Sequence, residues 1–332
     1  MKIALLGSKD YDSLEFHLND SLTFLGHTVF HIDIKDVSRL PLRYNYWLQQ
    51  FFQGYDARIF KKIAKRIVDE HPELVICTYR FIHPDCIRFI KRELPNTKVI
   101  HLNPDALTTF QRQQIFVSPY DAYFTKDPFI VDFMKNKMGL KVFYLPEAFN
   151  QRIHTYNFED RKTLEKNIDI DVVCFGTLYP YRAKMVERLV KAGIAVKLFG
   201  TADKRVSLPT INSLYQHEFI TGKRKAEVLL GSKIVFNNFH YAEIESVNAK
   251  FFEIAGMGAF QICDYKPTLE EYTGIPAEKF TFKHIDEAIS LMRYYLDKPL
   301  ERYQLSEKQK AHFLTHHTYD IRMQEMFQLL EI

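Results

Sequence analysis

The chain has 332 residues, of which 46% are hydrophobic and 14% aromatic, so it is long enough for two domains that each bury a core. Its formal charge of only +4 argues against a dedicated nucleic-acid-binding protein, whose basic residues usually create a strong positive field. The four cysteines form no CxxC pair, and no stretch approaches the roughly 20 apolar residues of a membrane span, so we expect reduced thiols, no metal site and a cytoplasmic location.

Short apolar runs alternate with helical patterns through the first half of the chain. Strands are expected at Lys2–Leu6, Thr28–Ile34, Leu74–Cys77, Lys98–Leu102, Ala122–Phe124 and Val142–Leu145. The helices expected between them include Asp56–Glu70, Pro84–Leu94 and Pro128–Lys137, the last two opening with Pro in the first turn. This alternation predicts a parallel, doubly wound sheet.

One segment of this half, Arg43–Tyr55, is unusually aromatic. On a helix, one broad face would carry Tyr44, Trp47, Leu48, Phe51, Phe52 and Tyr55, and Asn45, Gln49 and Gln53 would lie elsewhere. We interpret this face as core packing or as a homodimer contact. A weak peripheral contact with an anionic membrane is the alternative, because the cations Lys61, Lys62, Lys65 and Arg66 follow.

The alternation lapses in a polar stretch between Pro146 and Ile168 and then starts again. Strands are expected at Asp171–Phe175, Ala195–Phe199, Lys233–Phe236 and Phe260–Cys263, and helices at Ile285–Leu296, after Pro299 and at Tyr319–Leu330. We therefore predict an α/β chain with domains at 1–155 and 156–310, and a helix at 311–332 that packs back across them. Open parallel sheets bind ligands outside the carboxyl ends of their strands, so we expect the binding site there, in the cleft between domains.

Several enzyme classes lack their motifs in this chain. No GxGxxG follows the first strand, and GxxxxGK[ST], GxSxG and HExxH do not occur. A dinucleotide enzyme, a P-loop NTPase, a GxSxG hydrolase and a zincin are thus disfavoured.

Two glutamates, Glu245 and Glu253, are separated by seven residues. On one helix, this offset would place them about 80° apart and about 12 Å along the axis, where two carboxylates could flank an elongated ligand. Ser246 and Asn248 between them are helix-start residues, whose neighbouring N–H groups could face a diphosphate. The plainer alternative is a pair of exposed glutamates near a helix N-terminus.

The stretch SVNAKFFEIAGMGAFQICDYKPTLEEYTG resembles the signature of the CgeB-type glycosyltransferases, which are retaining GT-B enzymes with an E-x7-E motif. IDIDVVCFGTLYPYR, VKLFG, IVFNNFH and the tail from YYLDKPLERYQL onward are similar to the same family, whereas PELVI, LPNTKVIHLNPDAL, YDAYFTKD and GLKVFYLPEAFN resemble its N-terminal domain more loosely. The resemblance implies a GT-B fold with two Rossmann-like domains, parallel sheets that face a central cleft, and C-terminal helices. The turn Gly-Met-Gly and the segment NPDALTT depart from the family pattern.

The resemblance also implies roles for individual residues. Glu245 would contact the donor sugar and Glu253 the ribose, Arg182 and Lys250 would bind the diphosphate, and Gly176 and Thr177 would let the backbone approach it. A solvated surface arginine is the alternative for Arg182. The other substrate-binding candidates are Gly200, Phe219 and Ile220 for the base, His240 and Tyr241 near the phosphate or sugar, Ser246, Val247 and Asn248 at the helix start, and Asp105 on the acceptor side. For His240, a structural role at a strand end stays open.

The resemblance implies a hexosyltransferase that moves a sugar, with retention, from a UDP-sugar to a hydroxyl of a carbohydrate, lipid-linked or protein acceptor. The cation pair and the helix N-terminus predict that this transfer needs no metal or other cofactor. No nucleic-acid partner is expected. Two alternatives stay open: a catalytically silent nucleotide-sugar-binding scaffold, and a nucleotide-sugar epimerase of the same fold, which would need an additional acid or base.

Overall fold

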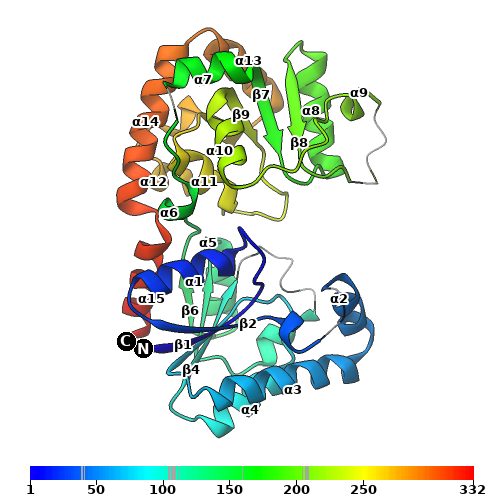
Figure 1. Cartoon of the computed structure of the whole chain (residues 1–332), viewed down its shortest axis with the longest axis vertical. Helices are drawn as coiled ribbons and strands as arrows, with labels where there is room; N and C mark the ends of the chain where they lie inside the picture. The colour runs from blue at the N-terminus through cyan, green and yellow to red at the C-terminus, as the bar shows by residue number, and fades with distance from the viewer. Residues whose placement is uncertain are drawn as a thin grey trace. The chain divides into compact units, whose positions relative to one another are not determined.

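The computed structural model describes residues 1–38, 40, 42–103, 105, 110, 112–158, 160–203, 205 and 209–332. They form two compact units. Unit 1 comprises Met1–Pro146, Ala242–Ser246 and Tyr319–Ile332, and unit 2 comprises Glu147–Tyr241 and Val247–Thr318. The first change of unit falls after Pro146, and two later segments of the chain, a short loop and the last helix, belong with unit 1 (Figure 1).

Unit 1 contains a six-stranded parallel sheet in the order β2-β1-β3-β4-β5-β6. Its strands are β1 (Lys2–Leu6), β2 (Thr28–Ile32), β3 (Leu74–Cys77), β4 (Lys98–Asn103), β5 (Ala122–Thr125) and β6 (Val142–Tyr144). Its main helices are α1 (Leu14–Phe24), α2 (Leu42–Phe51), α3 (Gln53–Asp69), α4 (Pro84–Glu93), α5 (Pro128–Asp132) and α15 (Tyr319–Leu330). All six strands predicted from the sequence are confirmed to within about two residues.

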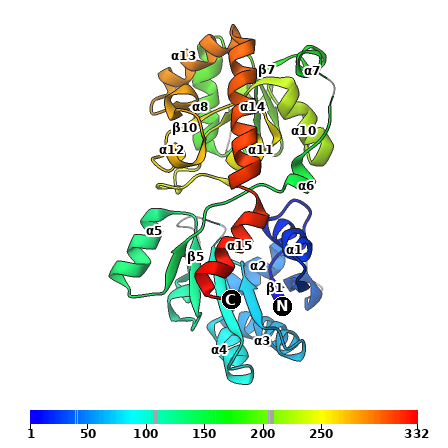
Figure 2. The same ribbon diagram turned by 90° about the vertical axis from the view of Figure 1, so that its left-hand side faces the viewer.

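Helix α3 illustrates why the elements of unit 1 could be predicted from the sequence. Ile59, Ile63 and Ile67 recur at four-residue spacing and are at most 4% exposed, in a core shared with β1, β3 and α4. The last helix, α15, packs on α1 (Figure 2), where the hydroxyl of Ser21 donates a hydrogen bond to Asp320. The C-terminal helix is therefore part of unit 1 and not of the preceding helical tail.

Unit 2 contains a five-stranded parallel sheet in the order β11-β10-β9-β7-β8. Its strands are β7 (Ile170–Phe175), β8 (Val196–Phe199), β9 (Ser232–Asn237), β10 (Gln261–Asp264) and β11 (Thr281–Phe282). Its helices include α6 (Gln151–His154), α7 (Arg161–Ile168), α8 (Pro180–Lys191), α9 (Pro209–Asn212), α10 (Gly222–Gly231), α11 (Ala249–Met257), α12 (Leu269–Tyr272), α13 (Ile285–Leu296) and α14 (Pro299–His316). The four expected strands are confirmed, whereas the two-residue β11 and helices α6 and α7 in the polar stretch escaped prediction.

Two further expectations can be compared with the structure. Cys77, Cys86, Cys174 and Cys263 are all buried and free, as predicted. Within the described part of the chain, no helix is long and apolar enough to cross a bilayer.

The expectation of core packing is wrong for four side chains of the predicted aromatic face, whereas Tyr55 is partly buried against the unit 1 core and the homodimer contact stays a prediction. Tyr44, Trp47, Phe51 and Phe52 are each more than half exposed, whereas Asn45 is fully buried. The side chains of Arg43, Gln49 and Gln53 lie outside the described residues.

Candidate functional site

The turns after β7 and β8 pack backbone against backbone at the carboxyl edge of the unit 2 sheet. The N–H of Gly176 donates to the carbonyl oxygen of Phe199 at 2.9 Å. Gly176 and Gly200 have φ angles of +93° and +107°, and a Cβ atom at position 200 would lie 2.7 Å from the carbonyl oxygen of Gly176. Both positions therefore require glycine, for their backbone conformation and for space.

Lys250 reaches this edge from the first turn of α11, which begins after the N-cap Asn248. The Asn248 side chain accepts the N–H of Phe251 at 3.0 Å, as expected for a helix start. The Nζ of Lys250 donates to the carbonyl oxygen of Phe175 at 2.8 Å and lies 4.7 Å from the centre of the Phe175 ring. A Cβ atom at Gly176 would lie 2.2 Å from this Nζ, so the glycine leaves the space that the ammonium group fills.

Arg182 approaches the same edge from α8 and is only 8% exposed. Its Nε donates to Oδ1 of Asn238 at 2.7 Å, its Nη2 to the carbonyl oxygen of Asn238 at 2.9 Å, and its Nη1 to that of Thr177 at 3.0 Å. The alternative of a solvated surface arginine is therefore wrong. The guanidinium is held in place by neutral acceptors at the ends of two strands.

Neutral oxygen atoms hold both cations within the described part of the chain. Among the described residues, no carboxylate forms an ion pair with Arg182 or Lys250; all their polar partners are carbonyl or amide oxygens. Burial, and next the positive charge of Arg182, lower the pKa of Lys250 to about 7. Two cations without an ion-pair partner among the described residues, beside a glycine turn and a helix N-terminus, form an arrangement suited to an anion such as a diphosphate.

Glu253 also lies on α11, where it is paired. One of its carboxylate oxygens lies 3.0 Å from the Nζ of Lys225 on α10, and the two side chains are only 13% and 4% exposed. Glu253 is therefore not the exposed surface glutamate of the plainer alternative.

Glu245 is placed differently from the sequence expectation. It precedes α11, in the Ala242–Ser246 segment that belongs to unit 1, so the two glutamates do not share a helix face as the eight-residue offset suggested. The segment is held by Asp127, whose Oδ2 accepts the backbone N–H groups of Ile244, Glu245 and Ser246 at 3.1–3.3 Å. A loop bound to unit 1 carries one motif glutamate, and a helix of unit 2 carries the other.

The remaining candidates divide between the two units. In unit 2, Phe219 and Tyr241 are 73% and 74% exposed, Ile220 and Val247 are buried, and the ring of His240 lies 4.2 Å from that of Tyr241 and 5.5 Å from that of Tyr179. In unit 1, Ser246 donates to Asp127 and Glu243, and Asp105 forms an ion pair with Arg80 at 2.6 Å. The unit 2 cluster around Gly176 thus includes Thr177, Arg182, Gly200 and Lys250, whereas Glu245, Ser246 and Asp105 belong to unit 1.

Sequence reasoning missed four polar residues that organise these sites: Asn238, Lys225, Asp264 and Asp127. Asp264 ends β10, accepts the N–H of Phe239 at 2.5 Å, and lines a pocket of about 240 Å³ together with Tyr181 and His240. Burial raises the pKa of Asp264 to about 6. Asn238, Asp264 and Asp127 stand at or just beyond strand ends, which is the signal that could have found them.

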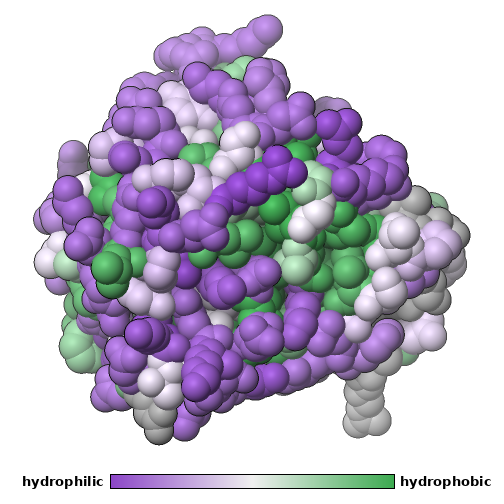
Figure 3. Space-filling view, turned by 90° about the horizontal axis from the view of Figure 1, so that it is seen from above, coloured by the Kyte–Doolittle hydropathy of each residue, from purple (hydrophilic) through white to green (hydrophobic). Residues whose placement is uncertain are grey.

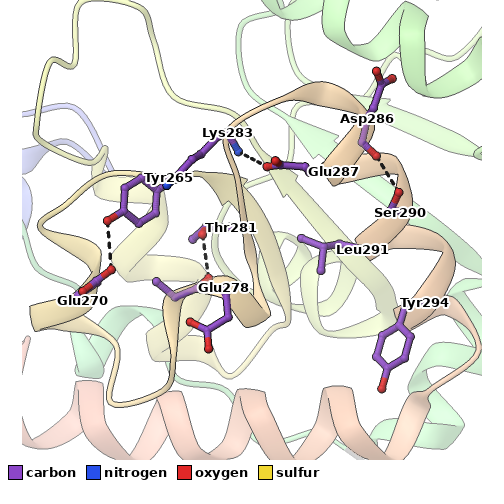
Figure 4. Close-up of a pocket in the computed structure, with 11 residues that line it drawn as sticks. Tyr265, Glu270, Glu278, Thr281, Lys283, Asp286, Glu287, Ser290, Leu291 and Tyr294 are labelled. Atoms are coloured by element: carbon purple, nitrogen blue, oxygen red, sulfur yellow. Dashed lines mark hydrogen bonds between the residues drawn. The ribbon is translucent and has the colours of Figure 1, made fainter.

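A larger hollow of about 790 Å³ lies beside β11 and α13 (Figure 4). Its lining includes the carboxylates Glu270, Glu278, Asp286 and Glu287 and the cation Lys283. Tyr265 donates to Glu270 at 3.0 Å, and the backbone of Lys283 to Glu287 at 2.7 Å. Because acidic groups outnumber cations there, this hollow would repel a diphosphate, and no residue predicted for the site lines it.

Residues 182–328 match a family model described as "Glycosyl transferase-like". This range contains Arg182, Lys250 and Glu253. No curated protein matches the chain in sequence.

Solved structures resemble the chain over nearly its whole length. Sucrose-phosphate synthase from Thermosynechococcus elongatus is 12% identical with a TM-score of 0.70, and 99% of this chain and 98% of that chain are covered. The N-terminal domain of Candida albicans trehalose-6-phosphate phosphatase is 9% identical, with a TM-score of 0.68 and coverage of 99% and 96%. T4 phage BGT, solved with its UDP-glucose substrate, is 10% identical, with a TM-score of 0.57 and both chains fully covered.

These likenesses define the class of fold. Two parallel sheets of six and five strands, each with helices, together with these neighbours, identify an α/β protein of the GT-B fold. The general part of the family resemblance is thereby supported, whereas the CgeB-type subfamily and a binding cleft stay predictions.

Proposed function

We propose that this chain is a glycosyltransferase that moves a sugar from a nucleoside-diphosphate sugar to an acceptor hydroxyl. The observation that carries the proposal is the pair Arg182 and Lys250, two cations without carboxylate partners among the described residues, at the strand ends of a GT-B unit. The match of residues 182–328 to a glycosyltransferase-like family supports it. UDP is the nucleotide we favour, because T4 phage BGT was solved with UDP-glucose.

The proposed chemistry follows from the charges. Cleavage of the bond between sugar and nucleotide leaves negative charge on the diphosphate, and fixed cations that face this charge stabilise the transition state. Arg182 supplies a charge already oriented by three hydrogen bonds, and Lys250 supplies a second one whose proton is retained once the anion is bound. The first N–H groups of α11 add the positive end of the helix dipole. We further propose that Glu253 binds the ribose and Glu245 the donor sugar, as the family resemblance implies.

Finer features of the reaction are proposals as well. The resemblance favours retention of configuration and transfer of a hexose, with a carbohydrate, lipid-linked or protein acceptor, in the cytoplasm. We propose metal-independent transfer because the two cations offer the charge stabilisation that a metal would otherwise supply. A structure of T4 phage BGT contains UDP and Mn²⁺, so metal dependence needs a direct test.

The experiment that tests the proposal is a calorimetric panel of UDP, GDP, dTDP and CDP, followed by their sugars, in wild type and in Lys250→Ala. We expect one preferred nucleoside diphosphate, and we expect Lys250→Ala to weaken it by about 10- to 150-fold while affinity for the nucleoside alone is nearly unchanged. Transfer measured in excess EDTA should persist. Absence of binding by all four diphosphates would overturn the proposal, and recovery of an EDTA-inactivated protein by Mn²⁺ or Mg²⁺ would overturn its metal-independent form.

One observation favours the epimerase alternative. Asp264, with its pKa raised to about 6, lies in a pocket with His240 and is a candidate acid or base of the kind this reaction needs. Incubation of the preferred nucleotide sugar without acceptor separates the two reactions. An epimerised nucleotide sugar would favour this alternative, whereas tight nucleotide binding without any turnover would favour the silent scaffold.

A further inference from the structure

Helix α2 of unit 1 is oriented so that the polar side chain of Asn45 faces the protein interior. Asn45 is fully buried: its Nδ2 donates to the carbonyl oxygen of Leu40 at 2.8 Å, and its Oδ1 accepts hydrogen bonds from the hydroxyls of Ser38 and Tyr55. A buried amide with these partners would lose them if the helix rotated, which costs about 1–3 kcal/mol per unsatisfied group. The network therefore fixes the orientation of α2.

The consequence is an exposed aromatic patch, which we define as Tyr44, Trp47, Phe51 and Phe52. Their exposed fractions are 61%, 53%, 62% and 54%. The ring of Trp47 lies 5.2 Å from that of Phe51 and 6.4 Å from that of Phe52, so these three side chains are contiguous. Large apolar groups gathered on a surface mark an interaction site far more often than single exposed ones do. Figure 3 shows another face of the molecule, on which hydrophilic side chains surround a hydrophobic area near the centre.

A basic surface adjoins the aromatic patch. Helix α3 begins directly after Phe52 and contacts α2 (Figure 1). While its isoleucines face the core, its exposed side chains include the five cations Arg58, Lys61, Lys62, Lys65 and Arg66. The formal charge of the whole chain is only +4, so this positive charge is a local concentration.

The neighbouring helix α4 extends this surface. A hollow of about 630 Å³ between α3 and α4 is lined by Arg58, Lys61, Arg88 and Arg92, with Asp85 as the acid among its lining residues. Arg88 pairs with Asp85 at 2.7 Å, and Arg92 with Glu93. Arg58 and Lys61, by comparison, have no carboxylate partner within the described ranges. The surface is complementary to an anionic partner.

We propose that the aromatic patch and the basic surface of α3 and α4 together dock unit 1 onto an anionic lipid bilayer. The aromatic side chains would enter the headgroup region, where rings of this kind are favoured, and the cations would face the lipid phosphates. Since no described helix can span a bilayer, the contact is peripheral. A nucleic acid fits less well, because base stacking needs free ring faces in the basic hollow, whereas the one aromatic residue in its described lining, Phe89, has the guanidinium of Arg92 over its ring at 5.0 Å. This proposal does not depend on the proposed function.

Trp47 can serve as a fluorescent reporter of vesicle binding, because it is the only tryptophan of the chain. The full-length protein is titrated with vesicles of phosphatidylcholine alone and with vesicles that also contain phosphatidylglycerol, while tryptophan emission is recorded. We expect a blue shift with the anionic vesicles, quenching by brominated acyl chains, reversal by high salt, and little change with neutral vesicles.

Two double variants test the cations of α3 and the aromatic patch separately. Lys61→Glu/Lys65→Glu should weaken binding to anionic vesicles at least about 30-fold, since each cation near such a surface contributes about 1 kcal/mol. Phe51→Ser/Phe52→Ser should weaken binding and prevent the blue shift. The matched control is Lys162→Glu/Lys166→Glu, which makes the same charge change at the same spacing on exposed positions of α7 in unit 2 and should leave binding unchanged. Thermal unfolding verifies that each variant is folded.

Three outcomes would overturn the proposal. The first is no blue shift and no quenching by brominated acyl chains with anionic vesicles. The second is an equal loss of binding in the α7 control, which would mean that only net charge matters. The third is tighter binding of a single-stranded oligonucleotide than of vesicles, dependent on the same lysines, which would make the surface a nucleic-acid site.

Discussion

The ammonium group of Lys250 fills the space that a side chain at Gly176 would need: an added Cβ atom would lie 2.2 Å from Nζ. The two residues are therefore coupled, and the cation is positioned by the absence of a side chain in the turn after β7. The proposed diphosphate site can be tested through this pair.

Replacement of Gly176 by Ala should displace Lys250 and weaken UDP binding by at least about 10-fold, because the new methyl group would take the place of the ammonium and force the flexible lysine side chain to shift. Gly193→Ala is the matched control: its φ is +83°, similar to the +93° of Gly176, but an added Cβ there meets nothing within 4 Å. Both variants should lose about 1–2 kcal/mol of folding stability from backbone strain. Calorimetry with UDP should distinguish them, and equal affinities would contradict the coupling.

Lys250→Met should make the free protein more stable while it abolishes high-affinity diphosphate binding. A lysine whose folded pKa is lowered to about 7 costs stability in full below pH 7, and this cost fades as the pH rises toward the ordinary value of 10.5. The melting temperature of the variant should therefore exceed that of the wild type most clearly near pH 6 and less near pH 9. A variant that is less stable than wild type at pH 6 would count against an uncompensated cation.

The pH dependence of UDP affinity should report the titration of Lys250. A bound diphosphate favours the charged lysine and raises its pKa, so the wild-type protein should take up protons on binding near neutral pH and bind more weakly as the pH rises from 7 to 9. Lys250→Arg keeps its charge throughout this range and should show a flatter profile. Calorimetry in buffers of different ionisation enthalpy measures the uptake, and identical profiles for the two proteins would refute the assignment.

Glu253→Gln should have two separable effects. It removes the carboxylate that lies 3.0 Å from Nζ of Lys225, which is 3% exposed, and breaking such a buried pair costs up to about 3–5 kcal/mol of stability. Adding Lys225→Met should restore most of that stability but not the affinity for UDP, which should stay about 10- to 150-fold weaker if Glu253 binds the ribose. Full recovery of UDP affinity in the double variant would make the glutamate purely structural.

Glu245→Gln should behave differently from Glu253→Gln. If Glu245 contacts the donor sugar, the variant should bind free UDP nearly as wild type does, while turnover with the sugar nucleotide falls steeply, because only interactions that strengthen in the transition state change turnover. Its backbone is held by Asp127 through the N–H group, so the side-chain change should leave the loop in place. Wild-type turnover in this variant would remove Glu245 from the proposed site.

Local sequence by itself determined much of the architecture. The β-strands could be predicted because buried parallel strands are short, nearly continuous apolar runs, and Ile59, Ile63 and Ile67 marked the inward face of α3 because helical periodicity places them together. Gly176, Arg182 and Lys250 were found as candidates because their residue types follow strands or begin helices in a family-like pattern. The strand β11 was missed because two residues carry almost no periodic signal.

Only the tertiary structure determined which partners these residues contact. Nothing local shows that Arg182 is fixed by Asn238, that Lys225 neutralises Glu253, or that Glu245 belongs to a loop held by Asp127, because these partners are 28 to 118 residues apart in the chain. The orientation of α2 was likewise beyond the sequence pattern, since hydropathy favours aromatic residues inside. The hydrogen bonds of one buried amide, Asn45, turn those residues outward, and the energy of such bonds depends on partners that only the folded chain brings within reach.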